Sequence, residues 1–242
     1  MRVIDYINSS SQTAFSFEVL PPLKGTGTGR LFGNIDRLME FNPGYINITT
    51  HHSEPVYQDM GNGMFRLGHI RRRPGTVAVA SAIHNRYGVP VVPHILCNGY
   101  TLEDTEYALI DLQLSGITDI LVLQGDKCKG DANTAPAKCG NKHAIDLQRQ
   151  VNRYNDGFFV DGTAMKEKGV PFSYGVACYP EKHEEAPNME FDLAVLKQKA
   201  DEGAAYAVTQ MFFDNSKYFA FVERARAIGI NIPIIPGIKP IH

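Results

Sequence analysis

Short apolar runs alternate with segments of helical periodicity along almost all of this 242-residue chain. Each run has the length of a strand, and each connection is long enough to hold a helix, as neighbouring parallel strands require. This pattern therefore predicts a parallel sheet covered by helices. The expected strands are 14–20, 45–49, 90–97, 119–126, 171–180, 206–213 and 232–238.

The spacing of these strands suits a closed barrel better than an open doubly wound sheet. We predict an α/β fold, a (β/α)8 TIM barrel truncated after its seventh strand, with residues 1–242 forming a single barrel catalytic domain. A barrel needs an eighth strand, and an open sheet edge is a liability. We therefore expect a C-terminal strand–helix unit to be missing from this chain, with a partner that covers the edge as the alternative.

Two helical features are specific enough to state in advance. Thr101 is expected to cap a helix, with Asp104 three residues later, and Gly116 to close it. The segment 57–87 is expected to be helical, with an interruption at Pro74–Gly75.

Composition excludes several classes of protein. The formal net charge is -2 with no basic block, which argues against nucleic-acid binding. No apolar run approaches the ~18 residues of a membrane span, and the N-terminus lacks a signal-peptide core. The cysteines lack CxxC spacing, and no histidines are placed for zinc, so we expect no metal and reduced thiols in a cytoplasmic protein. These cysteines are Cys97, Cys128, Cys139 and Cys178.

A glutamate lies inside the first apolar run. Phe15, Phe17, Val19 and Leu20 predict a strand buried on both faces, which ends at two prolines. An ionised carboxylate is costly in such a setting, so Glu18 should either have a partner or carry a proton near neutral pH. The alternative is a strand end where this side chain reaches solvent or an arginine.

Polar residues interrupt the other apolar runs at equivalent positions, near the carboxyl end of each predicted strand. In a barrel the carboxyl ends of the strands meet at one mouth, where active sites lie. No nucleophile with an adjacent base is found among them, which argues against acyl transfer. The residues at these positions are Glu18, Thr49, His94, Asp126, Tyr179 with His183, and Gln210.

Three of these residues have two interpretations each. Asp126 could accept a hydrogen bond from a bound heterocycle or act as a helix cap or loop aspartate. His94 could serve the site or be a hydrogen-bonded core histidine. Gln210 offers a donor and an acceptor to a planar amide-like ligand, or is a satisfied strand glutamine.

Two further motifs are interpreted as having no role in binding or catalysis. Gly25–Gly29 contains the spacing of a dinucleotide fingerprint, but it follows two prolines and does not join a strand directly to a helix. We expect a flexible loop there. The run Arg71–Arg73 is expected to be a solvated helix end.

Taken together, the strand-end motifs resemble the FAD-dependent, bacterial type of methylenetetrahydrofolate reductase. The resemblance implies a TIM barrel that reduces 5,10-methylenetetrahydrofolate to 5-methyltetrahydrofolate, in the one-carbon metabolism that serves methionine biosynthesis. The motifs are Phe17–Pro22, Asn47–Thr49, Pro93–Cys97, Leu123–Asp126, Ala177–His183, Thr209–Asp214 and Ile235–Ile238.

The resemblance also implies a mechanism and a set of residue roles. NADH or NADPH reduces FAD and leaves, and the folate then receives the hydride. Glu18 would be the general acid that opens the five-membered ring of the folate, a task that suits a protonated carboxyl group. Asp126 would lie beside the flavin and pterin rings, and Gln210 would bind the pterin. These three residues are the expected catalytic and substrate-binding set.

The implied FAD contacts extend over four strand ends and one helix. The chain departs from the family pattern in four places. Gln124 stands in place of arginine, Val195 of asparagine and His143 of tyrosine, and Thr50–His52 follow the second strand where Tyr-Gly-Ala is usual. The family habit and the open edge also suggest a homo-oligomer. The expected cofactor-binding residues are Thr49, His94, Leu123, Gly125, Asp126, Ala177, Tyr179, His183, Ala186, Asp192 and Lys199.

Two other functions are compatible with the same residues. One is a pterin-binding barrel methyltransferase, which needs an acidic residue on the pterin but no flavin. The other is a non-catalytic truncated remnant that acts only through interactions.

Overall fold

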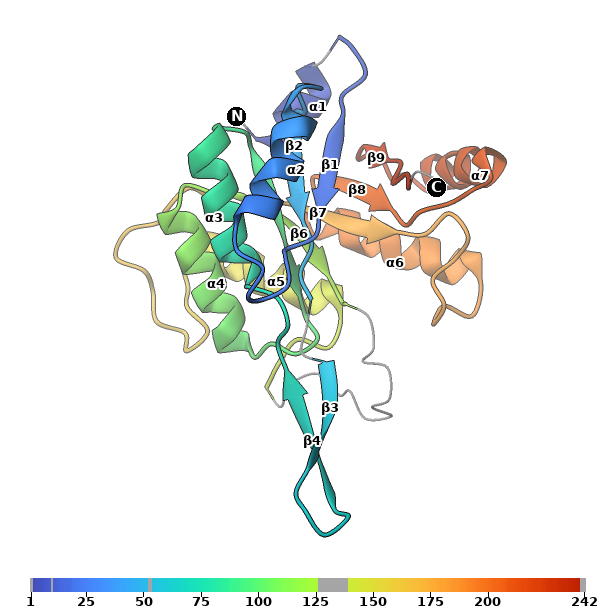
Figure 1. The fold of residues 1–242 in the computed structure, drawn as a ribbon. Coiled ribbons are helices and arrows are strands. Elements are labelled where there is room, and N and C mark those ends of the chain that lie inside the picture. The colour runs from blue at the N-terminus through green and yellow to red at the C-terminus, as the bar shows by residue number, and fades with distance from the viewer. Residues whose placement is uncertain (1, 10, 52–53, 126–138, 240–242) are drawn as a thin grey trace.

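The structure is a computed structural model that describes residues 2–9, 11–51, 54–125 and 139–239. Asp126 and Cys128 lie outside the described residues. The seven predicted parallel strands form one sheet with the order β1-β2-β5-β6-β7-β8-β9, which curls into a half-barrel (Figure 1). The strands are β1 Ser16–Val19, β2 Tyr45–Ile48, β5 Val91–Leu96, β6 Asp119–Leu123, β7 Ser173–Cys178, β8 Tyr206–Thr209 and β9 Ile234–Ile235.

A helix follows most strands, as the sequence pattern predicts. Thr101 caps α4 as expected, because its side chain accepts a hydrogen bond from the Asp104 backbone N–H while the Asp104 carboxylate accepts one from the Thr101 backbone N–H. The N-terminal helix α1 was not predicted. The helices are α1 Val3–Ser9, α2 Gly29–Met39, α3 Thr76–Tyr87, α4 Leu102–Leu114, α5 Ala144–Asn155, α6 Met189–Asp201 and α7 Asn215–Ala227.

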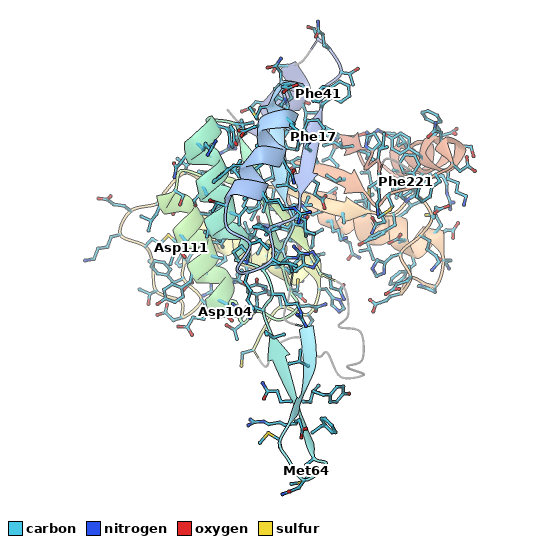
Figure 2. The ribbon with its side chains drawn as sticks, in the orientation of Figure 1. Phe17, Phe41, Met64, Asp104, Asp111 and Phe221 are labelled. Carbon is cyan, nitrogen blue, oxygen red and sulfur yellow. The ribbon has the colours of Figure 1, made fainter. Side chains whose placement is uncertain are left out.

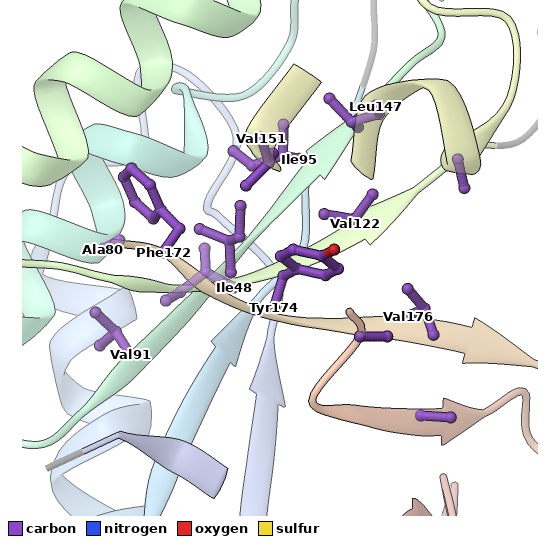
Figure 3. Packing of buried hydrophobic residues seen from close by; sticks show 14 of the residues in the cluster. Ile48, Ala80, Val91, Ile95, Val122, Leu147, Val151, Phe172, Tyr174 and Val176 are labelled. Carbon is purple, nitrogen blue, oxygen red and sulfur yellow. The ribbon is translucent and has the colours of Figure 1, made fainter. Parts of the chain in front are cut away.

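The main core fills the layer between the sheet and its outer helices. Ile48, Val122 and Val176 come from three strands, and Leu147 reaches them from α5 (Figure 3). All four side chains are fully buried. Because both faces of the central strands are covered, these strands are apolar runs without alternation.

A second, smaller cluster lies on the inner face of the sheet. It is formed by Tyr45, Val92, Leu121 and Tyr206 of the strands, with Val3 of α1 packed against them. Helix α1 therefore contributes to the core on the inner face of the sheet. The polar residues that follow the strands lie at the carboxyl end of the sheet, away from α1. One end of the sheet is therefore packed, and the other end is available for a binding site.

The prediction of a helix over the first half of 57–87 is wrong. That segment forms an antiparallel hairpin of β3 Glu54–Asp59 and β4 Phe65–Ile70, which projects away from the sheet with Met64 near its tip (Figures 1 and 2). The turn residues Gly61, Asn62 and Gly63 all have positive φ, at 82°, 55° and 73°. Glycine and asparagine tolerate this conformation, so the turn chemistry favours a hairpin. The second half of the segment is helix α3, which begins directly after Pro74–Gly75.

The prediction that the first strand is buried on both faces is also wrong. Phe15 and Leu20 flank β1 and are 60% and 46% exposed. Within the described residues β1 pairs only with β2 and forms one edge of the sheet. Burial of an apolar run depends on its neighbours in space, and this run has a strand on one side only.

Candidate active site

Polar side chains from several strand ends converge on one cavity of about 270 Å³ at the carboxyl mouth of the sheet. Parallel strands end on the same side, so the equivalent positions of these residues in the sequence become proximity in space. The structure therefore brings together all but one of the residues expected there, since Asp126 is not described. The predicted residues that line this mouth cavity are Glu18, Thr49, His94, Leu123, Gly125, Ala177, Tyr179, His183 and Gln210.

Glu18 is exposed at the mouth and has a hydrogen-bond partner on the next strand. The Thr49 hydroxyl donates to Glu18 Oε1 over 2.9 Å. Parallel pairing sets this contact, because Glu18 lies opposite Asn47 and the Thr49 backbone N–H donates to Val19 O at 3.1 Å. The expectation of a carboxylate within a two-faced apolar strand is corrected to a carboxylate that faces the mouth cavity and is oriented by a hydroxyl.

His94 lies at the floor of the mouth cavity and is only 4% exposed. Burial lowers its pKa to about 4, and the negative charge of Glu18 opposes this shift. The imidazole is therefore neutral at pH 7. Its Nε2 atom is buried and has no hydrogen-bond partner among the described residues, which favours a role in the site over a fully hydrogen-bonded core histidine. Thr50 fixes the backbone beneath it by donating its hydroxyl to His94 O at 2.5 Å.

A second cavity, of about 360 Å³, continues from the mouth toward helices α5 and α6. Because the two cavities have lining residues in common, they lie side by side, and we refer to the pair as the cleft. The shared residues are Leu123, Gln124, Ala177, Tyr179 and His183. The remaining expected cofactor contacts that the structure describes, Ala186, Asp192 and Lys199, line this helix-side cavity.

Lys199 provides a cation at the base of the helix-side cavity. Its ammonium donates to Ala177 O over 3.2 Å, and burial lowers its pKa while Asp192 opposes the shift. Asp192 is itself buried and accepts a hydrogen bond from the His183 backbone N–H at 2.9 Å. Lys199 is thus held between a carbonyl and the cavity, unlike a solvent-exposed helix lysine.

Tyr179 and His183 form the wall that the two cavities share. Their rings meet edge to face, with centroids 4.6 Å apart and an interplanar angle of 76°. The Glu185 backbone N–H donates to His183 Nδ1 at 3.1 Å, so in the neutral ring the proton is on Nε2. This wall offers an aromatic edge and a ring N–H to a ligand in the cleft.

Gln210 lies on the exposed rim of the mouth cavity. Its side-chain Oε1 accepts a hydrogen bond from the Met211 backbone N–H at 2.9 Å, and its own backbone N–H donates to Cys178 O at 2.8 Å. The second bond anchors the rim to β7. The amide is therefore positioned at the mouth rather than inside a strand, because β8 ends one residue earlier.

Sequence reasoning missed several lining residues. Phe191 and Gln198 of α6 line the helix-side cavity with Val195, and this i, i+4, i+7 spacing places the three on one helix face. That spacing was a usable signal. Three of the departures from the family pattern, Gln124, Val195 and His143, line the same cavity, whereas Thr50 and His51 line the mouth cavity.

Two classes of site are absent from the described part of the chain. No group of three or more His, Cys, Asp or Glu side chains could hold a metal ion there. Among the helices that the structure describes, none has the length and apolarity needed to cross a membrane.

Comparison with known proteins decides the family. The sequence profile described as methylenetetrahydrofolate reductase matches residues 3–242. The chain belongs to the methylenetetrahydrofolate reductase family. The resemblance carried by the strand-end motifs is thereby confirmed.

Curated relatives of this family align with nearly the whole chain. Methylenetetrahydrofolate reductase (NADH) 1 of Arabidopsis thaliana is 33% identical over 254 residues, which cover 100% of this chain and 38% of the plant protein. The 5,10-methylenetetrahydrofolate reductase of Escherichia coli is 31% identical over 230 residues, covering 95% of this chain and 65% of the bacterial protein. The chain thus spans less than two thirds of the length of either relative.

Solved structures support the barrel class of the fold. A Clostridium thermocellum protein that binds two copies of 5-methyl-5,6,7,8-tetrahydrofolic acid matches with a TM-score of 0.53 at 13% identity, over 96% of this chain and 67% of that one. A 2,3-dimethylmalate lyase matches with a TM-score of 0.55 at 12% identity, over 99% of this chain and 74% of that one. At such low identity these matches show the fold alone.

Proposed function

We propose that this chain carries the barrel of an enzyme that reduces 5,10-methylenetetrahydrofolate to 5-methyltetrahydrofolate, with FAD as bound cofactor and NADH or NADPH as reductant. One observation carries the proposal. In a member of this family, two adjacent cavities with a common wall contain Glu18 at the mouth and Lys199 beside α6. Catalytic and substrate-binding roles are proposed for Glu18, Asp126 and Gln210.

The residues of the cleft fit FAD. His94 Nε2 is a buried polar atom without a partner among the described residues, which a ring nitrogen or carbonyl of a flavin at the mouth would satisfy. Lys199 and His183 both line the helix-side cavity, and these groups suit a diphosphate. FAD, when bound, supplies the hydride-transfer chemistry, and the protein supplies orientation and electrostatics.

One departure from the family pattern, Gln124 in place of arginine, leaves the helix-side cavity with little positive charge. Lys199 is the only lysine or arginine among the described residues that line the helix-side cavity. Gln124 and Val195 add no charge to it. We therefore propose that cofactor affinity in this chain depends on Lys199 more than it would with an arginine at position 124.

Glu18 is proposed to move the proton that opens the folate ring. A pterin that occupies the mouth would cover this carboxyl group, and burial favours the protonated form of a carboxylic acid. Thr49 holds the side chain through Oε1, which leaves the other oxygen free to carry the proton to a ring nitrogen of the folate. The neutral His94 nearby adds no positive charge that would retain the ionised form.

The visible spectrum of the protein purified from its full gene tests this function. We expect flavin absorbance that is bleached by NADH or NADPH and restored by 5,10-methylenetetrahydrofolate, with one 5-methyltetrahydrofolate formed per flavin. A colourless protein that takes up no added FAD would overturn the proposal. If such a protein transferred a methyl group from 5-methyltetrahydrofolate, the flavin-free methyltransferase would replace it.

A further inference from the structure

A third cavity, of about 300 Å³, lies beside the mouth at the carboxyl end of β1. Its lining starts at Leu20, two residues after Glu18 of the mouth cavity in the sequence, and the two cavities have no lining residue in common. Two arginines from distant parts of the sequence, Arg30 and Arg73, line it together. We call it the arginine pocket. Its lining residues are Leu20, Pro21, Pro22, Leu23, Thr26, Arg30, Leu31, Asn34 and Arg73.

Each of the two motifs that the sequence analysis set aside contributes one lining residue to the arginine pocket, Thr26 and Arg73. The glycine-rich segment that follows Lys24 and the run Arg71–Arg73 are fastened to each other, because the Lys24 backbone N–H donates to Arg72 O at 2.7 Å. The Arg73 guanidinium also donates to Pro21 O, which fixes this side chain against the end of β1. Arg71–Arg73 is therefore not a helix end, since it lies between β4 and α3.

The charge of the arginine pocket is uncompensated. No Asp or Glu occurs among its described lining residues, and no carboxylate that the structure describes forms an ion pair with Arg30 or Arg73. The nearest acid along α2, Asp36, is engaged elsewhere, since it accepts from the Tyr87 hydroxyl at 2.6 Å and lies 3.7 Å from Arg86. Two guanidinium groups without counter-charge thus face one cavity in a protein whose formal net charge is -2.

The position of Arg30 is unfavourable for helix stability. It lies in the first turn of α2, which contains no acidic residue. The helix macrodipole places positive partial charge at this end, so a cation there is repelled. The helix would form more readily without this charge. A ligand is therefore a better explanation for it than the fold.

We propose that the arginine pocket binds the oxyanion end of the ligand whose ring occupies the mouth. Guanidinium groups recognise carboxylate and phosphate with paired, charge-assisted hydrogen bonds. The inference rests on the proposed function, because a tetrahydrofolate carries its glutamyl carboxylates on an aminobenzoyl spacer away from the pterin. A phosphate of the nicotinamide co-substrate has the same recognition chemistry, and the experiment separates the two sources.

The test compares Arg30→Gln with Arg37→Gln in the full protein. The Arg37→Gln substitution removes the same charge from the last turn of the same helix, at a residue outside the arginine pocket. Binding of 5-methyltetrahydrofolate, of its polyglutamylated form, and of a tetrahydropterin without the aminobenzoyl-glutamate tail is measured by titration, along with NADPH and NADH. We expect Arg30→Gln to weaken binding of both folates about tenfold, the effect of losing one charge-assisted hydrogen bond. We expect the tail-less pterin to bind equally to both variants.

Each outcome of this test decides a different point. Loss of a preference for NADPH over NADH in Arg30→Gln, with folate binding unchanged, assigns the arginine pocket to the phosphate and retains the proposal. Unchanged binding of folates and nucleotides in Arg30→Gln overturns the proposal while leaving the function intact. Failure of the tail-less pterin to bind the wild-type protein counts against the function. In that case, thermal melting with inorganic phosphate tests anion binding in the arginine pocket. Phosphate should raise the melting temperature of Arg37→Gln but not of Arg30→Gln.

Discussion

The Thr49 hydroxyl donates to Glu18 Oε1 over 2.9 Å, which joins the ends of β1 and β2 at the mouth of the sheet. The pairing of these two strands fixes the backbone of both residues, so the contact follows from the fold. It selects one orientation for an otherwise exposed carboxylate. A proton donor must be held in reach of its acceptor, and this hydroxyl provides the restraint.

Replacing Glu18 by Gln should abolish folate reduction and leave reduction of FAD by the nicotinamide largely intact. Gln keeps the oxygen that accepts from Thr49 but has no acidic proton to give. The loss should be about 100-fold or more, the usual contribution of a general acid. Rapid-mixing absorbance of the two half-reactions measures it. Equal loss in both half-reactions would show that Glu18 is structural.

A Thr49→Val variant separates orientation from proton transfer. It removes the hydroxyl and keeps the carboxyl group, so folate reduction should fall about tenfold, less than in Glu18→Gln. Its FAD reduction should remain near the wild-type rate. A loss as large as that of Glu18→Gln would place a catalytic role on Thr49 itself.

Replacing Lys199 by Met should weaken FAD binding by a factor of about 10 to 100, because this ammonium is the cation of the helix-side cavity. Stability should change little, since burial already disfavours the charge and Met retains the apolar stem. Fluorescence titration with FAD and thermal melting give the two values. Lys197→Met is the matched control, because Lys197 pairs with Asp201 at 2.6 Å on the surface of the same helix. Equal FAD affinity in both variants would contradict the assignment.

His94 should titrate far below an ordinary histidine. Burial lowers its folded pKa to about 4 from 6.5, so the unfolded state takes up a proton first as pH falls. Its contribution to stability is therefore present above pH 6.5 and is lost as pH falls toward 4, by up to about 3 kcal/mol. The NMR shifts of the ring protons should show this midpoint. Because the charge of Glu18 raises this pKa, Glu18→Gln should move the midpoint lower. A midpoint near 6.5 would refute the burial argument.

Sequence patterns sufficed where local chemistry decides the structure. The buried run of β5 and the cap formed by Thr101 and Asp104 were predictable, because each depends on residues a few positions apart. The hairpin of β3 and β4 was missed because its signal is the turn Gly61–Gly63 rather than an apolar period. Turn chemistry was a local signal as well, and it went unused.

The candidate site was predictable as a set of strand-end residues but not in its environments. Exposure of Glu18 depends on which strand lies beside β1, and the pKa of Lys199 depends on its packing beside Ala177 and Asp192. Neither is encoded in a short window of sequence. The arginine pocket shows the same limit, because Arg30 and Arg73 become neighbours only through the fold.

Asp119 at the amino end of β6 should make the protein less stable as pH rises. It is 6% exposed and accepts a hydrogen bond from the Val3 backbone N–H at 3.1 Å. Burial raises its pKa to about 6 from 3.8, so the folded state binds the proton more tightly than the unfolded state. The resulting stability is fully present below pH 3.8 and is lost as pH rises through about 6, up to about 3 kcal/mol.

An Asp119→Asn variant tests this directly, because Asn keeps the oxygen that accepts from Val3 and cannot ionise. Urea unfolding at pH 5 and pH 8 should show that Asp119→Asn gains stability relative to wild type at the higher pH. Asp111→Asn on helix α4 is the control, since it removes an exposed carboxyl group that is not among the charges that shift the pKa of Asp119. The prediction fails if the Asp119→Asn and wild-type curves stay parallel between the two pH values. In that case the ionised carboxylate is as well solvated in the fold as in water, and α1 packs over the strands without a titrating contact.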